Sequence, residues 1–174
     1  VTGLDGDVTR YTYDAAGRRI ETASGTLTTS YRYDSVGNLL TQATSGASEI
    51  AFSYSYNKNG YITGEVRTEN GQTTESSYAY DALGNLVGQT DELGNRTTFS
   101  YTAESLLEQV TYANGASQSL SYDLAGNVIG ETDAEGNAKQ YQYDKANRLI
   151  AVIDEMGSKT AYAYDAMNQI VQVT

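Results

Sequence analysis

The sequence at residues 78–86 is YAYDALGNL, and near copies of this stretch recur along the whole chain. Two aromatic residues at the first and third positions precede an Asp, a Gly follows three residues later, and an aliphatic residue ends the motif. Eight copies with a period of about 21 residues fill the 174-residue chain. Such a period is typical of repeat architectures, in which each unit packs on its neighbours. We therefore predict one repeat array over residues 1–174.

The copies share two aromatic positions, one position for a turn-forming Asp, and one position for a residue that tolerates positive φ. Their residues at these four positions are Tyr11, Tyr13, Asp14 and Gly17; Tyr31, Tyr33, Asp34 and Gly37; Tyr54, Tyr56, Asn57 and Gly60; Tyr78, Tyr80, Asp81 and Gly84; Phe99, Tyr101, Thr102 and Ser105; Leu120, Tyr122, Asp123 and Gly126; Tyr141, Tyr143, Asp144 and Asn147; and Tyr162, Tyr164, Asp165 and Asn168. The aliphatic position is assigned to Ile20 in the first copy and to Leu39 in the second.

The segment before each Asp has the pattern of a β-strand. Residues 28–33, TTSYRY, alternate with a period of two and are rich in β-branched and aromatic types. The two tyrosines of a pair are two residues apart, so they project from the same face of the strand. Aromatic cross-strand neighbours contribute about 0.2 to 1 kcal/mol per pair. We expect the tyrosine pairs to form a ladder that holds the strands together.

The Asp-x-x-Gly segment predicts a type I turn. Asp accepts a hydrogen bond from the backbone two residues on, and Gly takes the left-handed conformation. Followed by another strand, this turn makes a hairpin with a G1 bulge. Asn147 and Asn168 replace Gly in two copies, and Asn tolerates positive φ best after Gly. Ser105 does not fit this rule, so we expect its hairpin to be the least regular.

A second turn signal follows the apolar strand in several copies. We therefore predict an all-β fold of tandem antiparallel hairpins, with about sixteen strands and no helix. Open sheets rarely exceed about 10 strands without curling, so one long curved or spiralling sheet is expected. Neither end shows a recognisable capping unit, so we expect a fragment of a longer chain. The second turn signals are Asn70-Gly71, Asn114-Gly115 and the Asp-x-x-Gly segments that begin at Asp91, Asp133 and Asp154.

Composition and charge exclude several function classes. The formal net charge is −11, and the 11 basic residues are scattered, which argues against nucleic acid as a partner. The longest purely apolar run, residues 149–153, is far shorter than the about 20 residues of a bilayer span, so we expect no membrane insertion. The chain has no Cys, so it forms no disulfide and no thiolate metal site.

The residues needed for catalysis are largely missing. The chain contains no His and no Cys, and it shows no Gly-x-Ser-x-Gly elbow and no phosphate loop. Asp133 and Glu135 form a carboxylate pair of the kind used by glycosidases, but Asp133 is required by its turn. A calcium ion needs 6 to 8 converging oxygens, and no matching spacing occurs. We expect no enzyme activity, no cofactor and no metal.

The Tyr-Asp motif, nearly intact at residues 33–39, 80–86 and 122–128, resembles the YD-repeat or RHS-repeat family. The resemblance implies a section of a hollow β-sheet cocoon in a secreted or cell-surface protein. In the RHS and Tc-toxin C proteins such a cocoon encloses a C-terminal toxin, and in the teneurins a similar shell belongs to an adhesion receptor. The family's self-cleaving segment carries an Asp-Pro signature, and this chain has no Pro, so self-cleavage is not carried over.

Two other functions stay open at this point. One is a cell-surface adhesion or carbohydrate-binding array, in which exposed tyrosine rings contact a glycan. The other is a self-assembling extracellular filament, in which sheet edges of neighbouring chains pair. The partners implied by these hypotheses are adjacent repeats of the same or a neighbouring chain, an encapsulated toxin domain, or a cell-surface glycan.

Overall fold

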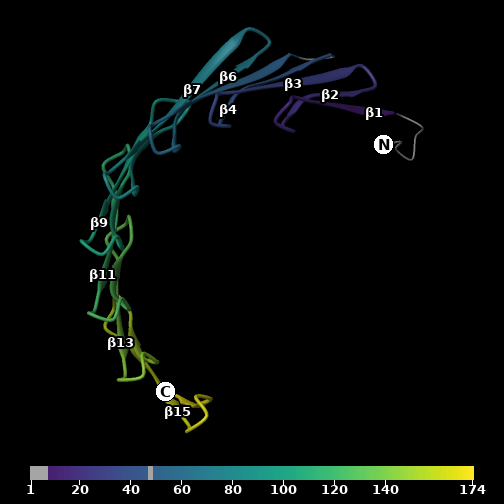
Figure 1. Ribbon diagram of the computed structural model, residues 1–174. Helices are drawn as coiled ribbons and strands as arrows, with labels where there is room; N and C mark the ends of the chain where they lie inside the picture. Colours follow the sequence, from purple (N-terminus) through teal and green to yellow (C-terminus); the bar gives the residue numbers. More distant parts are fainter. Residues whose placement is uncertain (1–7, 47–48) are drawn as a thin grey trace. The chain divides into compact units, whose positions relative to one another are not determined.

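The computed structural model describes residues 8–46 and 49–174, and these form β-strands joined by turns, with no helix (Figure 1). In the described residues no helix is long and apolar enough to cross a membrane. The strands are β1 (Thr9–Tyr13), β2 (Arg19–Ser24), β3 (Leu27–Tyr33), β4 (Leu39–Ser45), β5 (Ile50–Tyr56), β6 (Ile62–Glu69), β7 (Gln72–Tyr80), β8 (Leu86–Thr90), β9 (Arg96–Tyr101), β10 (Leu107–Thr111), β11 (Ser117–Tyr122), β12 (Val128–Thr132), β13 (Ala138–Tyr143), β14 (Leu149–Ile153), β15 (Lys159–Tyr164) and β16 (Ile170–Val173).

The 16 strands lie in one unclosed antiparallel sheet, and their order in the sheet is their order in the chain. Short turns join consecutive strands, and a short turn can only bring a strand back beside the one before it. The predicted all-β class and the predicted strand number are confirmed. By its contacts the chain divides into two compact units, Val1–Ala79 with Gln89–Asn95, and Tyr80–Gly88 with Arg96–Thr174.

In the motif hairpins whose strand register is described, a second β-bulge lies beyond the predicted G1 bulge of the turn, and the sequence did not reveal it. In the β3–β4 hairpin Tyr33 pairs with Leu39, but Arg32 pairs with Thr41, so Leu40 is an extra residue in the ladder. The same shift occurs in β1–β2, β5–β6, β9–β10, β11–β12, β13–β14 and β15–β16. The bulged residues include Thr63, Glu108 and Ile129, which share no side-chain type, so no sequence pattern marks the bulge.

The strand register of β1 and β2 corrects the predicted aliphatic position of the first copy. Tyr13 pairs with Arg19, so Arg19 takes the place that Leu39 has in the second copy, and Ile20 is the bulged residue. The prediction of Ile20 as the aliphatic position is therefore wrong by one residue. A pattern that requires an aliphatic residue does not identify Arg19 at this position. The Arg19 guanidinium lies over the rings of Tyr11 and Tyr31, at 6.0 and 4.9 Å from their centroids. Arginine can serve here because its long stem packs along apolar surface.

The two faces of the sheet differ in side-chain size. Strand pairing places the motif tyrosines with the residues opposite them on one face, which we call the Tyr face; in β5 this face carries Phe52, Tyr54 and Tyr56. The alternate residues form the other face, where small residues recur, as at Ser55 opposite Gly64. In the second unit the same alternation puts Tyr122 on the Tyr face, and Ser121 opposite Gly130 on the other.

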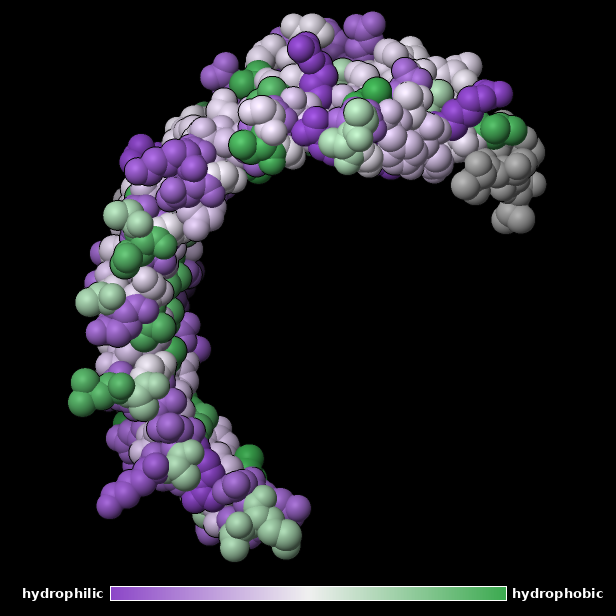
Figure 2. All heavy atoms as spheres, viewed as in Figure 1, coloured by the Kyte–Doolittle hydropathy of each residue, from purple (hydrophilic) through white to green (hydrophobic). Residues whose placement is uncertain are grey.

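Neither unit has a covered core. Among the hydrophobic residues that the structure describes, only Ala151 is buried, at 1% exposure. A sheet without a second layer leaves both faces accessible, so its side chains can be buried only by their neighbours on the same face. Figure 2 shows apolar residues on the visible surface as groups interspersed among polar ones. The cohesion of the chain must therefore come from lateral contacts between repeats.

Candidate functional site

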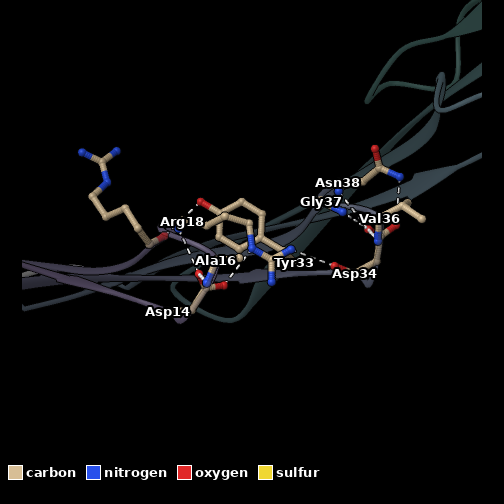
Figure 3. Close-up of polar contacts among 9 residues, drawn as sticks. Asp14, Ala16, Arg18, Tyr33, Asp34, Val36, Gly37 and Asn38 are labelled. Atoms are coloured by element: carbon tan, nitrogen blue, oxygen red, sulfur yellow. Dashed lines mark hydrogen bonds and ion pairs between the residues drawn. The ribbon is translucent and has the colours of Figure 1, made fainter.

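The motif turn is held by the Asp at its start. In the first copy Asp14 Oδ1 accepts hydrogen bonds from the backbone N–H groups of Ala16 and Arg18, both at 2.9 Å (Figure 3). The backbone closes the turn as well, because Gly17 N–H donates to the Asp14 carbonyl at 3.0 Å and Asp14 N–H donates to the Arg18 carbonyl at 2.9 Å. Gly17 has a φ of +78°, the left-handed conformation that this hairpin requires.

The copy with the weakest motif adopts the same turn. Ser105 has a φ of +63°, its N–H donates to the Thr102 carbonyl at 3.0 Å, and Thr102 N–H donates to the Leu106 carbonyl at 2.8 Å. The hydroxyl of Thr102 takes the acceptor role of Asp, with distances of 3.2 and 3.3 Å. The expectation that this hairpin is the least regular is wrong, since its turn bonds and register match those of the other copies.

The second turn signals identified in the sequence form turns of two kinds. Asn70 and Gly71 form a two-residue turn in which both residues have positive φ, +48° and +79°. Asn114-Gly115 differs, because only Gly115 has positive φ and its N–H donates to the Tyr112 carbonyl at 2.9 Å. That turn has the five-residue form of the Asp turns, with Tyr112 at the place of Asp. The turns starting at Asp91, Asp133 and Asp154 share this form.

The fourth residue after the turn Asp, which we call the linking position, connects one repeat to the next in four copies, through Arg18, Asn85, Asn127 and Arg148. It is Arg18 in the first copy and Asn38 in the second, and Asn85, Asn127 and Arg148 hold it in three later copies. Arg18 Nε donates to Asp14 Oδ2 at 2.7 Å, and its Nη1 donates to the Asp34 carbonyl in the following turn at 3.0 Å (Figure 3). Its guanidinium also lies 5.0 Å from the centroid of the Tyr33 ring.

The linking position also contacts the residue with positive φ in the next copy. Asn85 Nδ2 donates to Ser105 Oγ at 3.0 Å, and Asn127 Nδ2 donates to Asn147 Oδ1 at 3.0 Å. Arg148 Nη1 donates to Asn168 Oδ1 at 2.8 Å. This role was not predicted from the sequence, although a recurring Asn after the Gly was visible in the motif. The role of each Asp in its own turn accounted for the motif. Nothing in the motif indicated a contact with the neighbouring copy.

The second tyrosine of the motif makes another bond between repeats. Its hydroxyl donates to the backbone carbonyl at the aliphatic position of the preceding copy, next to the bulge. The distance is 2.9 Å from Tyr33 to Arg19 and 2.8 Å from Tyr56 to Leu39. A bulge interrupts the strand ladder locally, so a side-chain donor at this place helps to satisfy the backbone. Tyr101, Tyr122 and Tyr164 make the same bond to Leu86, Leu107 and Leu149, at 2.9, 2.6 and 2.7 Å.

The predicted site residues therefore lie in rows along the sheet, and they are not gathered into one pocket. Phe52 and Tyr54 have stacked rings with centroids 6.5 Å apart, but they belong to the same strand. In the part of the chain that the structure describes, hydroxyl, amide and guanidinium groups bond neighbouring copies to each other. No group of three or more His, Cys, Asp or Glu side chains among those residues is arranged to hold a metal ion.

Hydrogen bonding shifts the acidity of the turn carboxyls. The pKa of Asp14 is lowered from 3.8, first by the backbone N–H of Arg18 and then by its side chain. The pKa values of Asp81 and Asp123 are lowered chiefly by the side-chain amides of Asn85 and Asn127. On the Tyr face, burial is the main cause that raises the pKa of Tyr56 above 10.0. These shifts favour charged carboxylates in the turns and neutral, donating tyrosines between the strands.

A chain of similar hairpins, in which neighbouring copies are joined by bonds from the linking position or from the second tyrosine, is a tandem-repeat β-sheet protein. The model of the RHS Repeat family matches residues 80–118, 122–155 and 143–174, which together make up more than half of the chain. The chain belongs to the RHS repeat family.

Solved structures share the fold. The Photorhabdus luminescens Tc holotoxin pore with the TccC3-D651A mutation matches 99% of this chain at 17% identity, with a TM-score of 0.57. The complex of TcdB2-TccC3 with Cdc42 matches 99% of it at 17% identity, with a TM-score of 0.56. This chain spans 11% and 12% of the length of the matched chains. No match is found among curated proteins.

Proposed function

We propose that this repeat array is a section of wall in a β-sheet shell that encloses another polypeptide, a C-terminal toxin domain. The scaffold is non-enzymatic, and residues 1–174 act as one continuous array. The observation that carries the proposal is the repeated bond from the second tyrosine to the preceding copy, seen for example from Tyr122 to Leu107. This bond and the bonds of the linking position join each repeat that makes them to its neighbour, as the wall of a shell requires.

The partners follow from this role. Adjacent repeats are the first partner, because the linking residues Arg18 and Arg148 contact the following turn. The enclosed polypeptide is the second, and the protein that contains the array is secreted or exposed at the cell surface. The structural similarity to a Tc toxin complex, at 17% identity, supports the proposal at the level of the fold.

The test is protection of the enclosed segment from protease in the full-length protein. The same segment expressed alone serves as the control, and a broad-specificity protease is added to both under native conditions. We expect the enclosed segment to be cleaved at least tenfold more slowly within the full-length protein. Equal cleavage rates, or an image of the particle by electron microscopy that shows an open sheet, would refute the shell.

The glycan-binding and filament alternatives have less support. The hydroxyls of Tyr33, Tyr56 and Tyr122 already donate to backbone carbonyls, so their protons are not available to a sugar. Tyr11 and Tyr13 are more exposed, at 42% and 56%, and a glycan array would report whether they bind. Light scattering that shows a monomer at high concentration would count against the filament.

A further inference from the structure

The first aromatic position of the motif lacks a ring in one copy, at Leu120. The other seven copies have Tyr or Phe at this position. Leu120 lies on the Tyr face of β11, opposite Glu131 in β12, and it is half-buried. A leucine side chain is shorter than a phenol ring, so this copy fills less of the Tyr face than its neighbours do.

The next copy shows where the missing ring would lie. Tyr141 occupies the first aromatic position there, and its hydroxyl donates to Glu131 Oε2 at 2.7 Å. Glu131 pairs with Lys139, two residues before Tyr141, just as Val110 pairs with Gln118, two residues before Leu120. Val110 is therefore the counterpart of Glu131, and a ring at position 120 would extend toward Val110.

The structure has a hollow at this place. Its volume is about 170 Å³, and Leu107, Val110, Leu120, Gln118 and Glu131 are among its lining residues. We call this hollow the leucine notch. An engineered apolar cavity of about 150 Å³ in another protein binds benzene, so the notch has the size for one aromatic ring. Three aliphatic side chains supply its apolar wall.

The polar wall of the notch suits a phenol. Glu131 Oε2 accepts the Tyr141 hydroxyl at 2.7 Å, and Gln118 Oε1 accepts the Tyr112 hydroxyl at 2.7 Å. Both acceptors thus already bind phenol hydroxyls of this chain. A carboxylate offers about four lone-pair sites and an amide oxygen offers two, so each has acceptor capacity left.

We propose that the leucine notch binds the phenol ring of a tyrosine side chain from a polypeptide segment that lies along the Tyr face. The ring occupies the place left by Leu120, and its hydroxyl donates to Glu131 or Gln118. The identity of the segment as enclosed polypeptide rests on the proposed shell. The selectivity for a phenol rests on the notch alone.

The test is methyl NMR of the protein titrated with p-cresol, N-acetyl-tyrosinamide and toluene. We expect p-cresol and N-acetyl-tyrosinamide to shift the methyl signals of Leu107, Val110 and Leu120, with toluene at least threefold weaker than p-cresol. Leu120→Tyr fills the notch with the residue that other copies have, so it should abolish the shifts at Leu107 and Val110. Leu124→Tyr is the matched control, because Leu124 is fully exposed in the adjacent turn and its replacement leaves the notch open.

Three results would overturn the proposal. They are shifts spread evenly over all repeats, shifts that persist in Leu120→Tyr, and toluene binding as tightly as p-cresol. The outcome is separable from that of the protease experiment. Phenol binding with no protection of the enclosed segment would refute the shell and leave the phenol site. Protection without phenol binding would refute only the notch.

Discussion

At the scale of single residues, the turn depends on two requirements that different side chains can meet. The first is an acceptor at the start of the turn, and Asn57 meets it with its amide oxygen, which accepts from Asn59 N–H at 2.9 Å. The second is a residue that tolerates positive φ, where Asn147 and Ser105 replace Gly. The backbone geometry is thus preserved while the residue type varies.

Ser105 offers a direct test of the second requirement. A residue other than Gly or Asn at positive φ costs about 1 kcal/mol, and Asn can also supply an acceptor for Asn85, as Asn147 does for Asn127. We expect Ser105→Asn to raise the free energy of unfolding by about 0.5 kcal/mol. Ser105→Ala should lower it by about 1 kcal/mol, because it loses the bond to Asn85. Urea unfolding measures both, and equal stability of the two variants would contradict this account.

At the scale of the strand pair, the bulge and the second tyrosine act together. The bulge shifts the register after the aliphatic position, and the tyrosine of the next copy donates to the carbonyl beside it. The tyrosine thereby joins two hairpins that are consecutive along the chain. The second position is Tyr in all eight copies, and in five of them its hydroxyl makes this bond, whereas the first aromatic position includes Phe99 and Leu120.

Removal of one hydroxyl should show how much this bond contributes to the free energy of unfolding. Tyr122→Phe keeps the ring but deletes the donor to the Leu107 carbonyl, which lies 2.6 Å away. We expect the free energy of unfolding to fall by about 1 kcal/mol, the usual net contribution of one hydrogen bond. Tyr162→Phe is the control, because the Tyr162 hydroxyl has no hydrogen-bond partner within the described residues. A loss of the same size in both variants would show that the bond to Leu107 contributes nothing specific.

At the scale of the whole molecule, stability is the sum of many similar links between neighbouring repeats. Nearly all hydrophobic side chains in the described residues stay at least partly exposed, so no central core dominates. The repeated turn carboxylates should therefore act together when the pH changes.

Acid should weaken the array. The pKa values of Asp14, Asp81, Asp91, Asp123 and Asp133 are lowered below 3.8 in the folded state. A lowered folded pKa adds stability that is fully present above the unfolded value and is lost as the pH falls through the folded value. We expect the thermal midpoint to be level from pH 7 to about pH 5 and to fall below about pH 4.

A substitution isolates one carboxylate from this effect. Asp123→Asn keeps an acceptor oxygen, as Asn57 does in its own turn, but it cannot be protonated in this range. Its thermal midpoint should fall less between about pH 5 and about pH 2.5 than that of the unchanged protein. Leu124→Asn adds the same side chain at an exposed neighbouring position and should leave the acid response unaltered. An identical acid response in all three proteins would contradict a role for the Asp123 shift.

Much of the fold was predictable because its signals are local. Alternation predicted the strands, Asp-x-x-Gly predicted the hairpin turns, and consecutive antiparallel pairing follows from short connections. The candidate site was predictable only in its residue types. The bulge at Leu40 and the substitution of Arg19 for an aliphatic residue depend on pairing with another strand, so no single segment encodes them visibly.

The sequence by itself determined the repeat, the all-β class, the strand number and the role of positive φ, because these depend on residues within one copy. Only the tertiary structure decided what joins one copy to the next. Arg18, Asn127 and the Tyr122 hydroxyl act across distances of 15 to 20 residues in the chain, and their partners become neighbours only when the strands pair. Two of the three partners are backbone carbonyls, which every residue has, so the sequence cannot single them out.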